Sequence, residues 1–135
     1  MRIVEAAMDA VIAMANETAT FAAVHRGALS AAQDVCCELG PSGPESTFMT
    51  KDGVIVLDVV FNAKHSDLEA ALDVLGNIHK ALAKRRAYPS SAGWQMLNIQ
   101  TTTFPRRIGR EADNTWLTAS ALSVSIYDKE VTENA

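Results

Sequence analysis

The chain has 135 residues, of which 48% are hydrophobic, and 12 Lys and Arg stand against 16 Asp and Glu, a formal charge of −4. This length and composition predict a single globular domain over residues 1–135 and exclude an intrinsically disordered chain. A net acidic chain is a poor non-specific binder of nucleic acid. We also expect no direct sequence-specific binding of nucleic acid.

The first half of the sequence predicts one helix and two strands. Apolar residues recur on one broad face of residues 2–16, which indicates a helix. Residues 17–31 leave two alternatives open, a short strand at 20–24 or a helical turn at 28–32. Residues 33–39 are typical of a strand, and the Gly- and Pro-rich segment 40–44 predicts a loop. Residues 47–50 can enter a further strand, and a turn at 51–53 places Gly53 where a positive φ is needed.

Residues 54–61 are apolar except for Asp58, so we expect a central strand covered on both faces. A lone acid there is costly unless it is hydrogen-bonded or faces a wet subunit interface. The next element is a helix from Asp67 to about Arg86, with a capping box of Ser66 and Glu69. Its apolar residues repeat at the spacing of one buried stripe, namely Leu68, Leu72, Leu75, Ile78 and Leu82.

The last part predicts two strands, 94–102 and 116–127, joined by a charged loop over 104–114. Leu122, Val124 and Ile126 alternate with Ser123 and Ser125, as in a strand with one wet face. The expected fold class is therefore α+β, with a mostly antiparallel sheet of about four strands and two helices packed on one face.

The adjacent residues Cys36 and Cys37 rarely reach disulfide geometry, and no zinc spacing surrounds them, so we expect reduced thiols. Glu5 and Asp9 interrupt the apolar run at the start of the chain, which argues against a signal peptide. No stretch approaches the roughly 20 apolar residues of a membrane span. We expect a protein kept inside a cell, or carried in a particle assembled there.

Catalytic signatures are absent from the sequence. His25, His65 and His79 match no metal or acid–base motif and are expected to be solvated or edge residues. No nucleophile elbow or phosphate-binding glycine loop occurs. The sequence therefore predicts no catalytic residue, no cofactor and no metal, and a protein that is not an enzyme. The rival interpretation is a small enzyme or ligand-binding domain with a pocket near His65 and Asp58.

The basic cluster of the loop is its most distinctive feature. Arg106, Arg107 and Arg110 could contact a phosphate, or they could pair with Glu111 and Asp113 or with acidic groups of a partner subunit. The acidic chain favours pairing. Aromatic residues beside arginines are enriched at protein interfaces. Trp94 and Trp116 flank the loop, and the expected interface residues are Arg106, Arg107, Arg110, Asp113 and Trp116.

The order of these elements, with the Phe104–Trp116 segment and the alternating strand ending at Ile126 and Tyr127, resembles the tail-terminator and tail-completion (minor capsid, head–tail joining) proteins of long-tailed bacteriophages. The likeness covers about residues 48–128. It implies a small α+β subunit of a phage or prophage virion that forms a homo-oligomeric ring, a hexamer in the family pattern. The ring terminates the tail tube and helps to join tail to head.

The resemblance also implies the partners. They are other copies of the chain, the tail tube protein and a head-completion or connector protein, with no membrane. The location implied is the virion tail or neck, after assembly in the cytoplasm of the bacterial host. Another head–tail connector component remains an open alternative.

Overall fold

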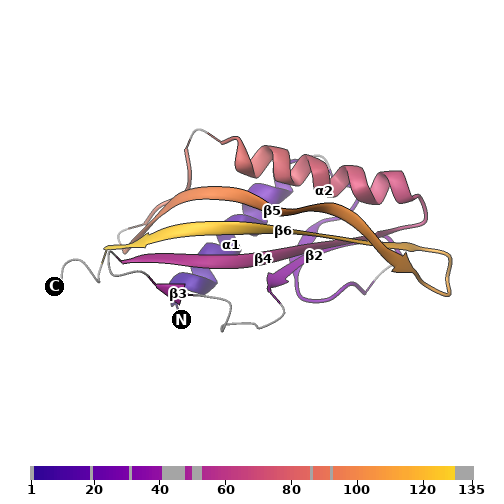
Figure 1. Ribbon diagram of the computed structural model, residues 1–135, viewed down its shortest axis with the longest axis horizontal. Coiled ribbons are helices and arrows are strands. Elements are labelled where there is room, and N and C mark those ends of the chain that lie inside the picture. The colour runs from indigo at the N-terminus through magenta and orange to yellow at the C-terminus, as the bar shows by residue number, and fades with distance from the viewer. Residues whose placement is uncertain are drawn as a thin grey trace.

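The computed structural model describes residues 2–18, 20–30, 32–40, 48–49, 53–85, 87–91 and 93–129. The described residues form two helices and six strands (Figure 1). They are α1 (Arg2–Asn16), β1 (Val24–Arg26), β2 (Asp34–Leu39), β3 (Phe48–Met49), β4 (Val54–His65), α2 (Leu68–Ala83), β5 (Trp94–Arg110) and β6 (Trp116–Asp128). The predicted α+β class is confirmed.

The six strands form one sheet in the order β1-β2-β4-β6-β5, and β3 also pairs with β4. The β1–β2 pair is parallel and the other described pairs are antiparallel. The mostly antiparallel character was predicted, whereas the strand number was too low. The two strands beyond the expected four are β1 and β3, of three and two residues. β3 lies within residues 47–50, where a strand was allowed, and β1 overlaps the strand alternative at 20–24 only at Val24.

The hydrophobic core lies on one face of the sheet, where both helices pack. Alternate residues of β4, including Leu57, Val59 and Phe61, are fully buried there. They share one cluster with Val11 of α1 and Leu75 of α2. Burying an aromatic or branched side chain of this kind contributes about 1.5–3 kcal/mol. The amphipathic pattern of both helices is therefore satisfied by a single sheet face.

The expectation that β4 is covered on both faces is wrong. The strand is central, between β2 and β6, but Val54, Val56, Asp58 and Val60 on its second face are half-buried. No described helix covers that face because α1 and α2 lie on the other. The strand also runs to His65 rather than Phe61, since pairing with β6 continues to Trp116.

The N-cap of α2 lies one residue after the predicted cap, Ser66. Asp67 is the N-cap, and its side chain accepts from the Glu69 backbone N–H at 3.1 Å. The predicted Ser66 capping box is wrong. A carboxylate caps as well as a hydroxyl and also interacts favourably with the positive end of the helix dipole. The helix ends at Ala83, short of the expected Arg86.

The predicted loop at 104–114 is also wrong, because β5 continues as a strand to Arg110. The connection to β6 is a tight turn over Glu111–Thr115. In it the Glu111 N–H donates to Thr115 O at 2.8 Å, and Asn114 takes a positive φ of 64°. Pro105 falls inside a register shift between Thr103 and Arg106, where the ladder is interrupted and a missing N–H is tolerated.

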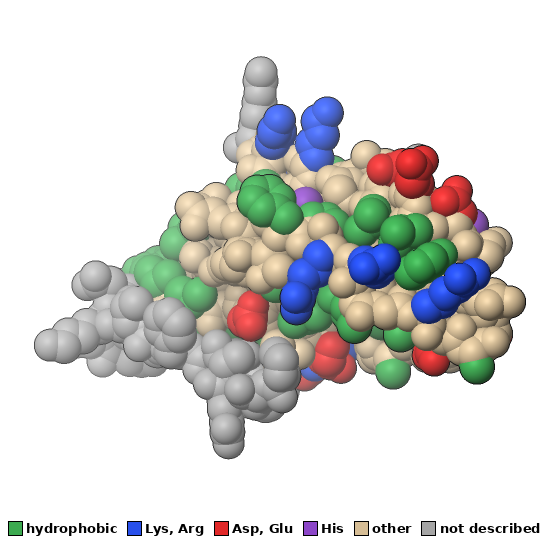
Figure 2. All heavy atoms as spheres, turned by 45° about the vertical axis from the view of Figure 1, so that its right-hand side comes forward, with side chains coloured by type: hydrophobic (Ala, Val, Ile, Leu, Met, Phe, Trp, Pro, Cys, Tyr) green, Lys and Arg blue, Asp and Glu red, His purple; other side chains and the backbone are tan. Residues whose placement is uncertain are grey.

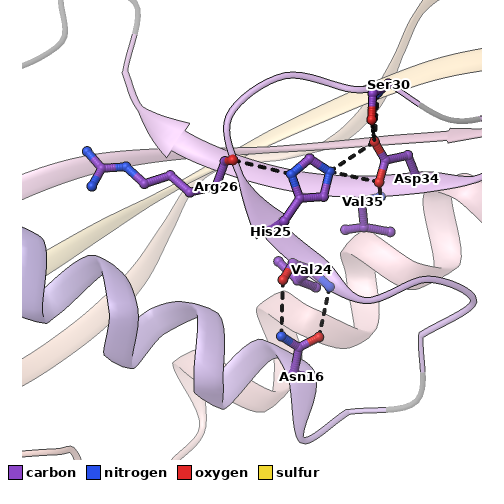
Figure 3. A network of polar contacts seen from close by, with 7 residues as sticks. All are labelled: Asn16, Val24, His25, Arg26, Ser30, Asp34 and Val35. Carbon is purple, nitrogen blue, oxygen red and sulfur yellow. Dashed lines mark hydrogen bonds and ion pairs between the residues drawn. The ribbon is translucent and has the colours of Figure 1, made fainter.

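A polar network holds β1 against α1 and β2 (Figure 3). The Asn16 side chain donates to Val24 O at 3.1 Å and accepts from Val24 N at 2.8 Å. His25 Nε2 lies 2.9 Å from an Asp34 carboxylate oxygen, and this hydrogen bond raises the pKa of His25. For residues 17–31, the described part has its strand at 24–26, and residues 28–30 are not helical.

Cys36 and Cys37 are free and buried on β2, in agreement with the predicted thiols. Cys37 belongs to the core cluster, while Cys36 pairs across from Asn62 on the opposite face. Burial raises the pKa of Cys36 to about 11 and that of Cys37 to about 12. Both thiols therefore stay protonated at neutral pH.

Two predicted turns are described only in part. Residues 41–44 and 51–52 lie outside the described residues, but Gly53 has the expected positive φ, of 82°. Gly40 donates its N–H to Asp58 O at 2.8 Å, and a Cβ at Gly40 would lie 2.4 Å from Asp58 Oδ2. A larger residue where the chain leaves β2 would therefore require the Asp58 side chain to move. Neither described helix combines the length and apolar character that a membrane crossing requires.

Candidate functional site: the β5–β6 hairpin end

The hairpin end, defined as residues 102–116, forms an outer corner of the sheet. Strand β5 pairs with β6 alone among the described strands. Its last residues include both basic and apolar side chains, and Phe104 and Ile108 are 78% and 57% exposed. Figure 2 shows a row of basic side chains interleaved with hydrophobic ones across this side of the molecule. Large apolar side chains this exposed are typical of interaction surfaces.

Two of the three arginines lie over the ring of Trp116. Arg110 and Arg107 lie with their guanidinium carbons 4.9 and 5.6 Å from the centre of the indole ring. Each such cation–π contact contributes about 0.5–1 kcal/mol at an exposed site. Register places Arg107 opposite Thr118 on the helix-bearing face and Arg106 opposite Ala119 on the other. The hairpin end therefore presents positive charge on both faces.

Asp113 is held within the turn and does not pair with the arginines. Its carboxylate accepts from the backbone N–H of Thr115 at 3.2 Å and lies 3.3 Å from Lys64 Nζ. The Thr115 hydroxyl also donates to it, and this bond is the main reason that the pKa of Asp113 is lowered. Asp113 thus fastens the turn to β4 rather than pairing with the arginines.

The arginines of the hairpin end keep their charge available. In the described part of the chain, Arg106, Arg107 and Arg110 form no ion pair with an acidic side chain. All three side chains are exposed. Pairing with Glu111 and Asp113, one of the alternatives from the sequence, is not what the structure has. The arginines are free to meet carboxylates of a partner.

The two tryptophans lie at opposite ends of the hairpin. Trp94 is buried and pairs with Asp128, whereas Trp116 is half-buried and pairs with Arg110. The structure brings Trp116 together with Arg107 and Arg110, whereas Arg106 lies on the other face and Trp94 lies at the far end of the hairpin. Sequence analysis missed Phe104 and Ile108, because the segment was predicted to be a charged loop and its apolar residues were not weighed as exposed strand residues.

The residues of the rival pocket do not converge. Asp58 lies on the helix-free face of β4 and His65 on the helix-bearing face, separated by seven residues or about 23 Å along the strand. His65 Nδ1 instead accepts from the Asp67 N–H at 2.9 Å. Among the described residues no group of three His, Cys, Asp or Glu could hold a metal ion.

The prediction that all three histidines are solvated or edge residues is wrong for His79. This side chain is only 5% exposed, and its Nδ1 forms a hydrogen bond of 2.8 Å with Thr101 Oγ1. Burial lowers its pKa to about 4. The signal was present in the sequence, because position 79 lies four residues after Leu75 and three before Leu82 on the buried stripe.

Comparison with known proteins gives a likeness in structure alone. No protein family and no curated protein matches this sequence. Among solved structures, the fold is similar to a chain described as "Virion of native gene transfer agent (GTA) particle", with a TM-score of 0.61 and 14% sequence identity. The match covers 89% of this chain and 93% of that chain. The two chains therefore share one fold over nearly their whole lengths.

Proposed function

We propose that this chain is a structural subunit of a phage-like virion, a tail-terminator or neck-completion protein that forms a ring. The observation that carries the proposal is the fold shared with a chain of a gene transfer agent virion over 89% of this sequence. The resemblance of residues 48–128 to tail-terminator proteins points in the same direction and adds the ring, the tail tube and the head as partners. The protein is proposed to act without catalysis.

The mechanism of such a subunit is geometric. A ring of identical copies presents one surface that matches the end of the tail tube and another that cannot recruit a further tube subunit. The hairpin end is the proposed contact with a neighbouring protein. Its exposed Phe104 and Ile108 offer apolar area, and its unpaired arginines offer charge to an acidic partner.

A charge reversal in the hairpin end tests this role. Arg107→Glu exchanges a cation over Trp116 for an anion and leaves the buried core untouched. We expect a folded protein that fails to restore normal-length, head-joined tails to particles lacking the gene, as seen by electron microscopy. Lys129→Glu, directly after the far end of β6, is the control with the same charge change; it loses only the bond from Lys129 Nζ to Ser91 O and should support assembly. Normal tails with Arg107→Glu would refute the role of the hairpin end.

The size of the protein in solution separates this proposal from its rival. A ring subunit should run as an oligomer, or become one when tail tube protein is added. A strictly monomeric protein that binds a metabolite would favour the enzyme or ligand-binding alternative. That alternative has lost its original pocket, since Asp58 and His65 lie on opposite faces of β4. A head-completion protein is distinguished by which neighbour it binds, the head connector or the tube.

A further inference from the structure

A groove of about 290 Å³ opens between α2 and the outer edge of β5. Its walls are formed by Gly76, His79, Ala83, Thr101, Phe104 and Pro105. Gly76 leaves its floor open, because a Cβ built there meets no atom within 4 Å. Phe104 is 78% exposed beside it, so the groove and this ring together form an apolar recess on the surface.

The groove contains an unsatisfied hydrogen-bonding atom. His79 Nδ1 is bonded to Thr101, but Nε2 is buried and has no partner among the described residues. A buried polar nitrogen left without a partner is destabilising.

The adjoining edge of β5 is unsuited to strand addition. Its pairing with β6 shifts register at four places, and Pro105 lacks an N–H at one of them. Bulges and prolines on an edge strand prevent a partner strand from forming a continuous ladder. An occupant must therefore bind through side chains or a helix end.

Charge along α2 indicates what that occupant is. Lys80 and Lys84 line the groove near the end of the helix, while Glu69 and Asp73 are exposed near its start. These four residues lie on one stripe of the helix. None of them forms an ion pair in the described part of the chain. Figure 2 shows basic and acidic side chains in separate places along the upper rim of this face.

We propose that the groove receives the acidic first turns of α2 from a second copy of this chain. Glu69 and Asp73 of one copy would face Lys80 and Lys84 of the next, with the half-buried Leu72 near the apolar wall. The acidic first turns and the groove lie at opposite ends of α2, so copies whose helices point the same way make a head-to-tail contact that repeats until a ring closes. Antiparallel helices would instead close a two-fold dimer, so a species that stays dimeric at every concentration would overturn this contact. The inference rests on the proposed ring and deepens it by assigning the contact between neighbours.

Complementary charge reversal tests the contact by sedimentation velocity over a concentration series. Lys80→Glu with Lys84→Glu makes both surfaces acidic, and Glu69→Lys with Asp73→Lys makes both basic. Each variant alone should associate about 100-fold more weakly than wild type, at about tenfold per reversed charge. An equal mixture should recover assembly, because acidic ends then meet basic grooves. Asp9→Lys on the exposed side of α1 is the control and should assemble normally.

A second pair of variants tests the apolar part without changing charge. Gly76→Met should fill the groove and weaken association, whereas Gly76→Ala should not, and both should stabilise the helix relative to glycine. If wild type forms rings and all variants do as well, the groove assignment is overturned while the proposed function stands. If wild type stays monomeric at every concentration, the inference is overturned. If the monomeric protein still caps tail tubes, the proposed function stands. If it does not cap them, the proposed function and the groove contact are both overturned.

Discussion

His79 gives a quantitative test of how the α2–β5 region is packed. The folded protein holds this imidazole at a pKa of about 4, because burial disfavours the charged form, against 6.5 for an ordinary histidine. Between these values the unfolded chain binds a proton that the folded chain does not, so stability rises with pH across this window. At about 1.36 kcal/mol per pH unit, the folded state loses about 3 kcal/mol from this group as the pH falls from 7 to 4.

The variant His79→Leu removes the titration and keeps the apolar stripe. We expect the difference in unfolding free energy between variant and wild type, measured by urea denaturation, to move by about 3 kcal/mol in favour of the variant between pH 7 and pH 4. Other groups titrate in both proteins and cancel in this difference. His25→Gln is the control, and below pH 6.5 its unfolding free energy should change with pH in parallel with that of wild type. Parallel losses in wild type and His79→Leu would refute the buried, neutral imidazole.

Three further predictions concern the core and the β1 network. Asn16→Ala removes both bonds to Val24 and should cost about 1–3 kcal/mol in urea denaturation; unchanged stability and unchanged amide exchange at Val24 would contradict the network. The hydrogen bond to Asp34 raises the pKa of His25, so its contribution is complete below pH 6.5 and is lost as the pH rises through the raised value. His25→Gln should therefore flatten the decline in stability above pH 6.5, and an unaltered pH profile would argue against it. Phe61→Ala leaves a cavity at the centre of the core and should lower the unfolding free energy by about 3–5 kcal/mol. A loss below about 1 kcal/mol would show that the surrounding side chains relax to fill the cavity.

Regular elements with a full period were predictable from the sequence. The stripe from Leu68 to Leu82 marked α2, and the alternation of Leu122, Val124 and Ile126 marked β6, since each side chain reports which way its backbone faces. The charged, proline-bearing segment 104–110 was not predictable as a strand. Pairing with β6 across register shifts holds it in place, and a tertiary contact of that kind leaves no local pattern.

The interface role of Arg106, Arg107, Arg110, Asp113 and Trp116 stays a prediction, and the segment that carries the arginines was predicted in a wrong conformation, a loop instead of a strand. Their residue types placed Trp116 and the arginines in one predicted group. Arg110 contacts Trp116 because the two residues pair across β5 and β6. The role of Asp113 depended on Lys64, which is 49 positions earlier in the sequence and adjacent only once β4 and β6 pair. Contacts between elements set the partner of a charge, and sequence spacing alone does not contain them.

The two buried thiols have a practical consequence. With pKa values of about 11 and 12, Cys36 and Cys37 are almost entirely protonated near pH 8, and buried protonated thiols react slowly with oxidants and alkylating reagents. The protein should therefore survive in air without added reductant. A single cysteine introduced on the surface, at Ile108 for example, should take up a fluorophore selectively while both native thiols remain in place.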